Sequence, residues 1–170
     1  MRSLRLSYWN INGIFRNGES KHENEEFVNS VQHYDIFGLV ETHTGPDDTI
    51  SIPNCHTYQA NRPKSINARK FSGGIAVLVK NDIKEGVKLC KTDTYSIWLK
   101  LEKSYFGVNN DIYVCITYLP PANSTYSRRA DVNCINVLEE QIQHFSLMGN
   151  IILLGDFNGR TANKGAFVPP

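Results

Sequence analysis

Polar side chains follow four apolar segments of the chain, at the points where each segment ends. These side chains are Asn10, Glu41, Tyr118, Asp156 and Asn158. Amide, carboxylate and phenol groups can bind a hard metal cation, orient a water molecule and donate hydrogen bonds to an oxyanion. In sheets that contain parallel strands, ligands gather at the carboxyl ends of the strands, so we expect these residues to converge in one cleft.

Each of these residues also has an ordinary structural explanation. An Asp or Asn after a strand commonly forms a turn or caps a helix, and a Tyr at a strand end is commonly an amphipathic surface residue. Glu41 taken alone is compatible with a solvated strand end. The coincidence of such residues at four strand ends favours a functional site.

Other motifs for chemistry are incomplete in this sequence. The segment 151–156 resembles the magnesium-binding strand of phosphate-loop NTPases, but the chain has no G-x-x-x-x-G-K-[ST] motif. Gly73-Gly74 lacks the dinucleotide-binding fingerprint and predicts a tight turn or close backbone packing. The 5 histidines form no helical metal-binding pair and the 4 cysteines have no zinc-like spacing. We therefore expect structural or exposed histidines and reduced thiols.

The first elements that must position these residues form a strand, a helix and a strand. Hydrophobic patterns predict strands at 4–9 and 36–40, and an amphipathic helix at 21–33 between them. Ser20 and Glu23 have capping-box spacing at the start of this helix. Such a succession predicts two parallel strands joined by a crossover helix.

The middle of the chain is rich in predicted strands, separated by Asn, Asp, Gly and Lys clusters that indicate successive antiparallel hairpins. These strands lie at 58–61, 74–80, 87–90, 95–102 and 111–118. A long helix is then predicted at 127–148, with Gly149 as its C-terminal cap. The next strand, 151–154, is apolar at every residue, which is typical of burial on both faces.

Composition limits the class of protein. The 170 residues contain 18 Lys and Arg against 17 Asp and Glu, for a net charge of +1, and predict one globular domain over 1–170. This near-neutral charge gives no global reason to bind a polyanion, so any such site must be local. The sequence has no signal-peptide pattern and no apolar run near about 18 residues. We expect an intracellular protein of the nucleus or cytoplasm that is neither secreted nor bound to a membrane.

Five motifs occur in the order found in the endonuclease/exonuclease/phosphatase superfamily. They are WNINGI at 9–14, VETHT at 40–44, SGGIAVLVK at 72–80, YLPP at 118–121 and ILLGDFNGR at 152–160. The set most closely resembles the apurinic-type endonuclease domain that precedes the reverse transcriptase of non-LTR (LINE-type) retrotransposons. The resemblance implies an α/β fold of the DNase I-like kind, a four-layer α/β/β/α sandwich of two mixed sheets with helices outside.

The resemblance also implies magnesium-dependent cleavage of DNA phosphodiesters, with Mn²⁺ as an alternative cation. Glu41 matches the acidic metal ligand of the family, and Asn10 matches the asparagine that supports the metal and phosphate site. Tyr118 matches the tyrosine that donates a hydrogen bond to the scissile phosphate. Asp156 and Asn158 match the pair that positions the attacking water and steadies the phosphate.

Basic residues in two loops offer a local surface for contacts with DNA phosphates. They are Arg62, Lys64, Arg69 and Lys70 in one loop, and Arg128 and Arg129 in the other. If these loops border the cleft, their cations contact the DNA backbone. The alternative is that they are ordinary solvated charges, which are common in any loop.

The sequence departs from the family pattern in three places. Val40 stands where relatives usually carry Gln, and Pro121 lies near a position where many relatives have a polar residue that contacts DNA. Relatives also end in a Ser-Asp-His segment whose Asp-His pair orients and protonates the active site, and no S-D-H occurs in this chain. The resemblance therefore implies a C-terminally truncated domain with an incomplete second sheet and little or no hydrolysis. An unpaired sheet edge would invite association with another chain.

Two alternative functions remain open at this point. One is a phosphatase or phospholipid-head-group hydrolase of the same superfamily, which shares the general motifs. The other is a non-catalytic remnant that binds DNA or protein. The motifs VETHT, SGGIAVLVK and YLPP favour the retrotransposon branch over the phosphatases.

Overall fold

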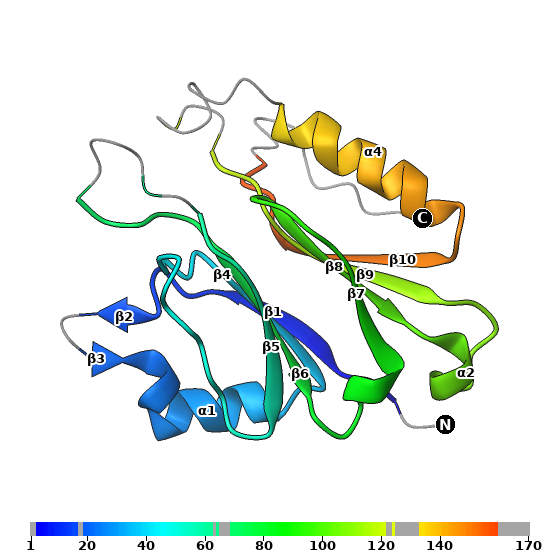
Figure 1. The fold of residues 1–170 in the computed structure, drawn as a ribbon, viewed down its shortest axis with the longest axis horizontal. Coiled ribbons are helices and arrows are strands. Elements are labelled where there is room, and N and C mark those ends of the chain that lie inside the picture. Colours follow the sequence, from blue (N-terminus) through cyan, green and yellow to red (C-terminus); the bar gives the residue numbers. More distant parts are fainter. Residues whose placement is uncertain are drawn as a thin grey trace, which may run out of the picture.

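The computed structural model describes residues 3–16, 19–62, 64, 69–121, 124 and 133–159 of the chain. In chain order the elements are β1 (Leu6–Asn10), β2 (Phe15–Arg16), β3 (Glu19–Ser20), η1 (Lys21–Glu23), α1 (Glu25–Gln32), β4 (Ile36–Val40), β5 (Cys55–Ala60), β6 (Ile75–Lys80), η2 (Lys84–Gly86), β7 (Val87–Thr92), β8 (Ser96–Leu101), α2 (Lys103–Phe106), β9 (Ile112–Tyr118), α4 (Cys134–Ser146) and β10 (Asn150–Asp156). Two four-stranded sheets lie face to face, with α1 outside one and α4 outside the other (Figure 1). This is the α/β/β/α sandwich of the DNase I-like fold that the resemblance implies.

Both sheets are mixed, and each has a parallel pair of strands at one edge. The first sheet has the order β1-β4-β6-β5, in which β1 and β4 are parallel and the other pairs antiparallel. The second has the order β10-β9-β8-β7, in which β10 and β9 are parallel and the other pairs antiparallel. The pairing of β1 with β4 confirms the predicted strand–helix–strand unit.

The expectation of successive antiparallel hairpins through the middle of the chain is wrong at one step. β5 pairs with β6 and β7 pairs with β8 as expected, but β6 and β7 belong to different sheets. The reason is that β6 already has β5 on one side and β4 on the other. Both of its edges are taken, so the chain passes through η2 and starts the second sheet.

The main core lies between the two sheets. Residues of β4 alternate, so that Ile36 and Val40 face the second sheet while Phe37 and Leu39 belong to the cluster under α1. Each such buried aliphatic or aromatic side chain contributes about 1.5–3 kcal/mol. The sheets approach closely at Gly38, where an added Cβ would lie 2.7 Å from the side chain of Ile116.

The first helix begins later than its predicted start at residue 21. Lys21–Glu23 forms a 3-10 turn, and α1 begins after Asn24, whose side-chain oxygen accepts a hydrogen bond of 3.0 Å from the Phe27 amide. Ser20 does not cap the helix because its hydroxyl is hydrogen-bonded to His22 Nδ1 at 2.9 Å. The predicted capping box is therefore replaced by an Asn cap one turn further on.

The second long helix, α4, begins after Asn133 and ends at Ser146; the predicted start at residues 127–132 lies outside the described residues. Its C-terminal cap is Leu147 in a right-handed conformation, so Gly149 does not serve as the cap. Glycine is required at 149 for a different reason, because an added Cβ would lie 2.2 Å from the carbonyl oxygen of Asp111. On the sheet face of α4, Gln141 accepts hydrogen bonds from Ser96 Oγ and Trp98 Nε1.

The apolar strand β10 is less buried than its sequence predicts. Ile151 and Leu153 pack against the α4 side while Ile152 and Leu154 pack into the core between the sheets, yet all four are half-buried. Within the described part of the chain, β10 lies at the end of its sheet and pairs with β9. An edge strand keeps part of each apolar side chain in contact with solvent, which accounts for the difference.

The expectations for the cysteines and for Gly73-Gly74 are confirmed. All four cysteines are free thiols, and Cys115 is fully buried in β9. Gly73 and Gly74 both adopt positive φ angles, of 70° and 86°, just before β6, as expected for close backbone packing. None of the described helices has the length and hydrophobicity needed to cross a membrane.

Candidate active site

Four polar side chains come from the carboxyl ends of the two parallel strand pairs. Asn10, Tyr118 and Asp156 are the last residues of β1, β9 and β10, and Glu41 directly follows β4. In register, Asn10 lies opposite Val40, and Asp156 lies opposite Tyr118. A hydrogen bond of 2.9 Å from Asn10 Nδ2 to Asp156 Oδ2 joins the two sheets at this point. The structure thus brings the predicted residues together, as the strand-end pattern led us to expect.

Backbone hydrogen bonds from two sides hold the segment 41–44 that carries Glu41. They run from Gly13 N to Glu41 O (2.7 Å), Ile14 N to Thr42 O (2.9 Å), Thr42 N to Gly74 O (3.3 Å) and His43 N to Gly73 O (2.8 Å). The first two extend the pairing of β1 with β4 beyond the strands, and the last two attach the segment to the paired glycines. The backbone of Glu41 is therefore fixed by contacts far apart in sequence.

This segment also has an unusual backbone conformation. Glu41 and His43 have φ angles of 55° and 56°, in the left-handed region that costs a non-glycine residue about 1–3 kcal/mol. Thr42 lies between these two residues and Thr44 follows His43. Both threonines are fully buried, and their hydroxyls are hydrogen-bonded to each other at 2.8 Å. Thr44 also donates to Asn61 Oδ1 at 2.8 Å. These buried contacts stabilise the strained conformation.

Tyr118 connects the two carboxylate-bearing parts of the site. Burial raises the pKa of Tyr118 well above its ordinary value, and the nearby carboxylate of Glu41 raises it further as a hydrogen-bond acceptor and through its negative charge. The phenol therefore stays protonated and acts as a hydrogen-bond donor.

Both carboxylate oxygens of Asp156 are held in place. Oδ2 accepts from Asn10 Nδ2, and Oδ1 accepts a hydrogen bond of 2.9 Å from the amide of Asn158. Asn158 has a φ of 45° and donates from Nδ2 to Leu119 O at 2.8 Å, which leaves one N–H of its carboxamide for another acceptor. This arrangement fixes the direction of the Asp156 carboxylate, which forms no ion pair with a cation in the described part of the chain.

His43 is a member of the site that the sequence interpretation missed. Its Nε2 lies 3.6 Å from Glu41 Oε2. Burial lowers its pKa, as do Lys21 and Lys70 nearby, whereas Glu41 opposes them. The signal in the sequence is the spacing in V-E-T-H-T, because two buried threonines that alternate with Glu41 and His43 place the latter two on one side.

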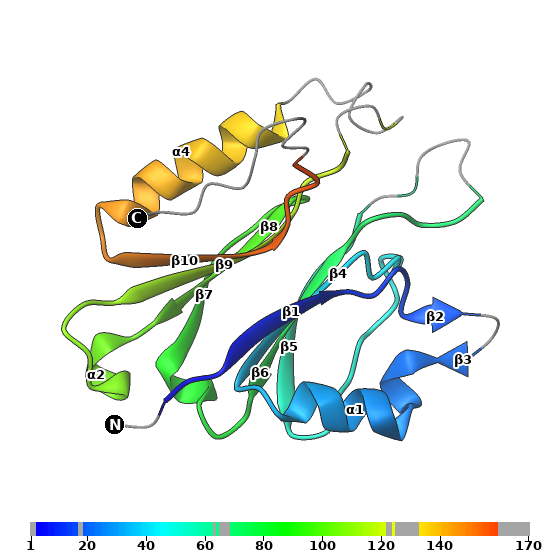
Figure 2. The ribbon, with the colours of Figure 1, turned by 180° about the vertical axis from the view of Figure 1, so that it is seen from behind.

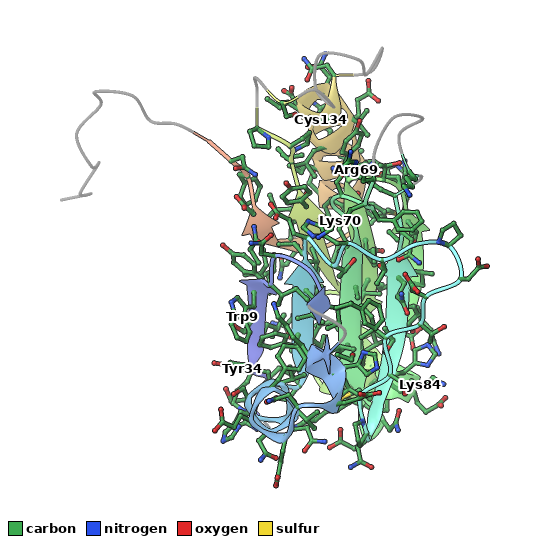
Figure 3. All side chains as sticks on the ribbon, turned by 90° about the vertical axis from the view of Figure 1, so that its left-hand side faces the viewer. Trp9, Tyr34, Arg69, Lys70, Lys84 and Cys134 are labelled. Carbon is green, nitrogen blue, oxygen red and sulfur yellow. The ribbon has the colours of Figure 1, made fainter. Side chains whose placement is uncertain are left out.

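The basic loop residues predicted to contact DNA differ in their exposure to solvent. Arg69 and Lys70 are exposed, at the same end of the molecule as Cys134 and away from Lys84 (Figure 3). Arg62 was expected at the surface with them, but its side chain is only 3% exposed because it packs between aromatic rings. Lys64 Nζ lies 5.6 Å from the ring centre of Phe71. Arg128 and Arg129 lie outside the described residues.

The donor set fits a hard divalent cation. The carboxylates of Glu41 and Asp156 both lie near Tyr118, and Mg²⁺ usually takes one or two carboxylates and keeps water for its other ligands. Among the described residues no group of three or more His, Cys, Asp and Glu side chains is placed to hold a metal. Such oxygen-rich sites with few protein ligands suit Mg²⁺ or Mn²⁺ better than a structural zinc.

A two-sheet sandwich with these residues at its strand ends defines a DNase I-like α/β protein. The sequence profile described as the Endonuclease/Exonuclease/phosphatase family matches residues 7–164, and the chain belongs to that family. A comparison with curated proteins gave no match.

Solved structures with the same fold include nucleases and phosphatases. The chain is similar to the human Nocturnin catalytic domain with bound sulfate (TM-score 0.59, 16% identity), covering 92% of this chain and 64% of that one. It is similar to the 3′ phosphatase NExo from Neisseria bound to a product DNA hairpin (TM-score 0.55, 15% identity, 95% and 60% covered). It also resembles a mannosyl-6-phosphatase from Bacteroides thetaiotaomicron (TM-score 0.56, 16% identity, 95% and 68% covered). The chain thus spans less than two thirds of the length of the first two structures.

Proposed function

We propose that the four strand ends form the active site of a divalent-metal-dependent phosphodiesterase that nicks DNA. The observation that carries this proposal is the hydrogen bond between Asn10 of β1 and Asp156 of β10. It joins the carboxyl ends of strands from the two sheets, next to Glu41 and Tyr118. A set of one metal-binding carboxylate, one water-orienting carboxylate and two neutral donors matches the needs of phosphodiester hydrolysis.

The residues have distinct roles in this proposal. Glu41 would hold Mg²⁺, with Mn²⁺ as a substitute, and the bound cation would neutralise charge on the phosphate and on the leaving oxygen. Asp156, held by Asn10 and by the Asn158 amide, orients the attacking water. Tyr118 stays protonated, and its single O–H would donate to a phosphate oxygen in place of Glu41. The second N–H of the Asn158 carboxamide would donate to the phosphate as well.

DNA as the substrate rests on two kinds of support. Arg69 and Lys70 are exposed cations at the site end of the molecule, which supplies local positive charge in a chain of net charge +1. The Neisseria phosphatase of the same fold is bound to a DNA hairpin. The five ordered motifs further favour the retrotransposon branch, for which the biological reaction would be target-site nicking.

The test is nicking of supercoiled plasmid by the 170-residue chain with Mg²⁺ and with EDTA. We expect Mg²⁺-dependent nicking, and a loss of about 100-fold or more in Glu41→Gln and in Asp156→Asn. Glu85→Gln, an exposed glutamate of η2, is the matched control and should nick like the wild type. Nicking that is indifferent to EDTA and to both site substitutions would overturn the proposal.

Binding provides a second measurement if nicking is slow. Fluorescence anisotropy of a labelled duplex oligonucleotide should show that the chain binds DNA more tightly when Mg²⁺ is added. In Glu41→Gln, Mg²⁺ should no longer increase the affinity. Hydrolysis of inositol phosphate or sphingomyelin without DNA cleavage would instead favour the phosphatase alternative, to which the similarity with the Bacteroides enzyme also points.

A further inference from the structure

Arg62 is a buried cation that binds neither the metal nor the phosphate in the proposed reaction. Its side chain is 3% exposed and lies two residues beyond β5, on the first sheet. Removing a charged group from water is costly unless specific partners compensate for it. A nearly fully buried guanidinium therefore calls for a reason in the structure around it.

Partners of Arg62 include Tyr118 in β9 and two residues of the connection between β7 and β8, all on the side of the second sheet. Its guanidinium carbon lies 4.9 Å from the ring centre of Tyr118 and 5.4 Å from that of Tyr95. Its Nη2 donates to the backbone oxygen of Tyr118 at 3.3 Å, and its Nε donates to Thr94 O at 3.4 Å. Arg62 thus contacts Tyr118 through both ring and backbone, and this is the phenol whose pKa is raised by the nearby Glu41 carboxylate as well as by burial.

Gly73 leaves the space that Arg62 occupies. A Cβ added to Gly73 would lie 2.5 Å from Nη1, 2.7 Å from the guanidinium carbon and 2.8 Å from Cδ of Arg62. Gly73 also has a φ of 70°, which other residues adopt only with strain. The first glycine of the pair before β6 is therefore required by the position of the guanidinium as well as by its own backbone.

We propose that Arg62 is a positioning residue, which holds the phenol ring of Tyr118 so that its hydroxyl stays aimed at the reacting phosphate. The guanidinium is suited to this role because it is planar, stacks on aromatic rings and donates in several directions, none of which lysine reproduces. Its positive charge also opposes the burial and the negative charge of Glu41 that raise the Tyr118 pKa. The functional part of this inference rests on the proposed phosphodiesterase activity.

A comparison of single and double variants in the nicking assay separates positioning from general stabilisation. Arg62→Met should lower kcat by about 10- to 100-fold with a smaller change in KM, as expected for a displaced group in the transition state. In a Tyr118→Phe background, the same substitution should cost no more than about twofold, because the hydroxyl it serves is gone. Equal losses in both backgrounds would overturn the positioning role. Arg62→Lys retains the charge and should restore little of the lost kcat.

Two further variants sharpen this test. Gly73→Ala should reproduce the kcat loss of Arg62→Met, because its methyl group displaces the guanidinium. Lys100→Met is the matched control: it removes a cation of the second sheet that pairs with Asp111 at 3.1 Å, and it should leave kcat unchanged.

A chemical measurement tests the contact even if the proposed activity fails. Tyrosine nitration by tetranitromethane, followed by peptide mapping, reports the exposure of the Tyr118 ring relative to Tyr105, which is 47% exposed. The ratio of nitration at Tyr118 to nitration at Tyr105 should rise in Arg62→Ala and in Gly73→Ala and stay unchanged in Lys100→Met. An unchanged ratio in Arg62→Ala would overturn the inference. Absence of nicking by the wild type would overturn the proposed function alone.

Discussion

Two strand–helix–strand units supply the strand ends of the site, one from each sheet. β1 and β4 are parallel and connected through α1, and β9 and β10 are parallel and connected through α4. The two edge strands, β1 and β10, lie near each other where the sheets are stacked (Figure 2). The same topological device occurs twice, and stacking brings the carboxyl ends of both parallel pairs to one place.

The two units hold their site residues in different ways. In the second unit, Tyr118 and Asp156 are still within paired strands and lie opposite each other in register. In the first unit, Glu41 lies beyond its strand in a left-handed conformation, on a segment held by distant glycines and buried threonines. Sheet register therefore positions one half of the site, and a network of loop contacts positions the other.

Two consecutive residues after β5 connect these halves. Asn61 accepts from Thr44 Oγ1 and donates to Gly45 O, so it supports the segment that carries Glu41. Arg62 packs on the ring of Tyr118. The same short stretch of chain thus supports a site residue from each sheet.

The largest effect expected from this comparison concerns one glycine in each half: Gly155, which directly precedes Asp156, and Gly74, whose carbonyl oxygen accepts a hydrogen bond from the Thr42 amide. A Cβ at Gly155, where φ is 143°, would lie 1.9 Å from the backbone oxygen of Thr117, and the paired strands cannot move apart to admit it. A Cβ at Gly74, where φ is 86°, would lie 2.4 Å from the Thr42 hydroxyl, which is a side chain that can shift. We expect Gly155→Ala to lower the free energy of unfolding by about 3 kcal/mol or more, and Gly74→Ala by about 1–3 kcal/mol. Urea denaturation measures both.

Gly107→Ala is the control for the backbone contribution alone. Gly107 has a φ of 66° and an added Cβ would meet nothing within 4 Å, so its substitution reports only the cost of the left-handed conformation, about 1 kcal/mol. If Gly155→Ala cost no more than Gly107→Ala, the claim that strand register fixes the second half of the site would be wrong.

The parts of the fold that the sequence predicts are those that depend on local pattern. Alternating or continuous apolar residues define β4 and β9, and a polar residue after each strand predicts where the site lies. The segment G-D-F-N is similarly local, because Asp156 accepts a hydrogen bond from the amide of Asn158 two residues later. Such contacts depend on residues that are adjacent in the sequence, so a pattern in the sequence reveals them.

The features that the sequence does not reveal depend on residues far apart. The burial of Arg62 depends on Tyr95, Tyr118 and Gly73, and a basic residue in a polar loop gives no sign of such partners. The position of His43 beside Glu41 depends on backbone bonds to Gly73 and on buried threonines. The division of β6 and β7 between sheets follows from the pairing of β6 with β4, which no local turn signal indicates.

A smaller effect is expected at His43, which belongs to the half of the site held by loop contacts. Its ring contacts Glu41 at 3.6 Å, so it helps to orient the carboxylate that would hold the metal. Substitution of a residue that orients a metal ligand commonly lowers metal affinity by about 10- to 100-fold. We therefore expect His43→Ala to raise the Mg²⁺ concentration for half-maximal nicking by about 10-fold. His33→Gln, at the exposed end of α1, is the control. An unchanged Mg²⁺ requirement in His43→Ala would show that Glu41 is oriented by its backbone and Tyr118 alone.

The smallest effect concerns the opposite end of β9, where a charged contact stabilises the fold without serving the site. Asp111 Oδ1 accepts from the Lys103 amide at 2.8 Å, and Oδ2 lies 3.1 Å from Lys100 Nζ. The amide hydrogen bond, followed by the Lys100 contact, lowers the Asp111 pKa below its ordinary value of 3.8. A carboxyl whose pKa is lower in the folded state than in the unfolded state stabilises the folded state at any pH above the unfolded-state pKa. This contribution disappears as the pH falls through the folded-state pKa. Wild type should therefore be more stable than Asp111→Asn near neutral pH, and urea denaturation curves of the two should converge as the pH falls below the ordinary pKa of 3.8 and through the lowered one. Nicking at neutral pH should be the same for both, because β9 places Asp111 and Tyr118 at opposite ends; a stability difference independent of pH would show that the carboxylate acts through shape rather than charge.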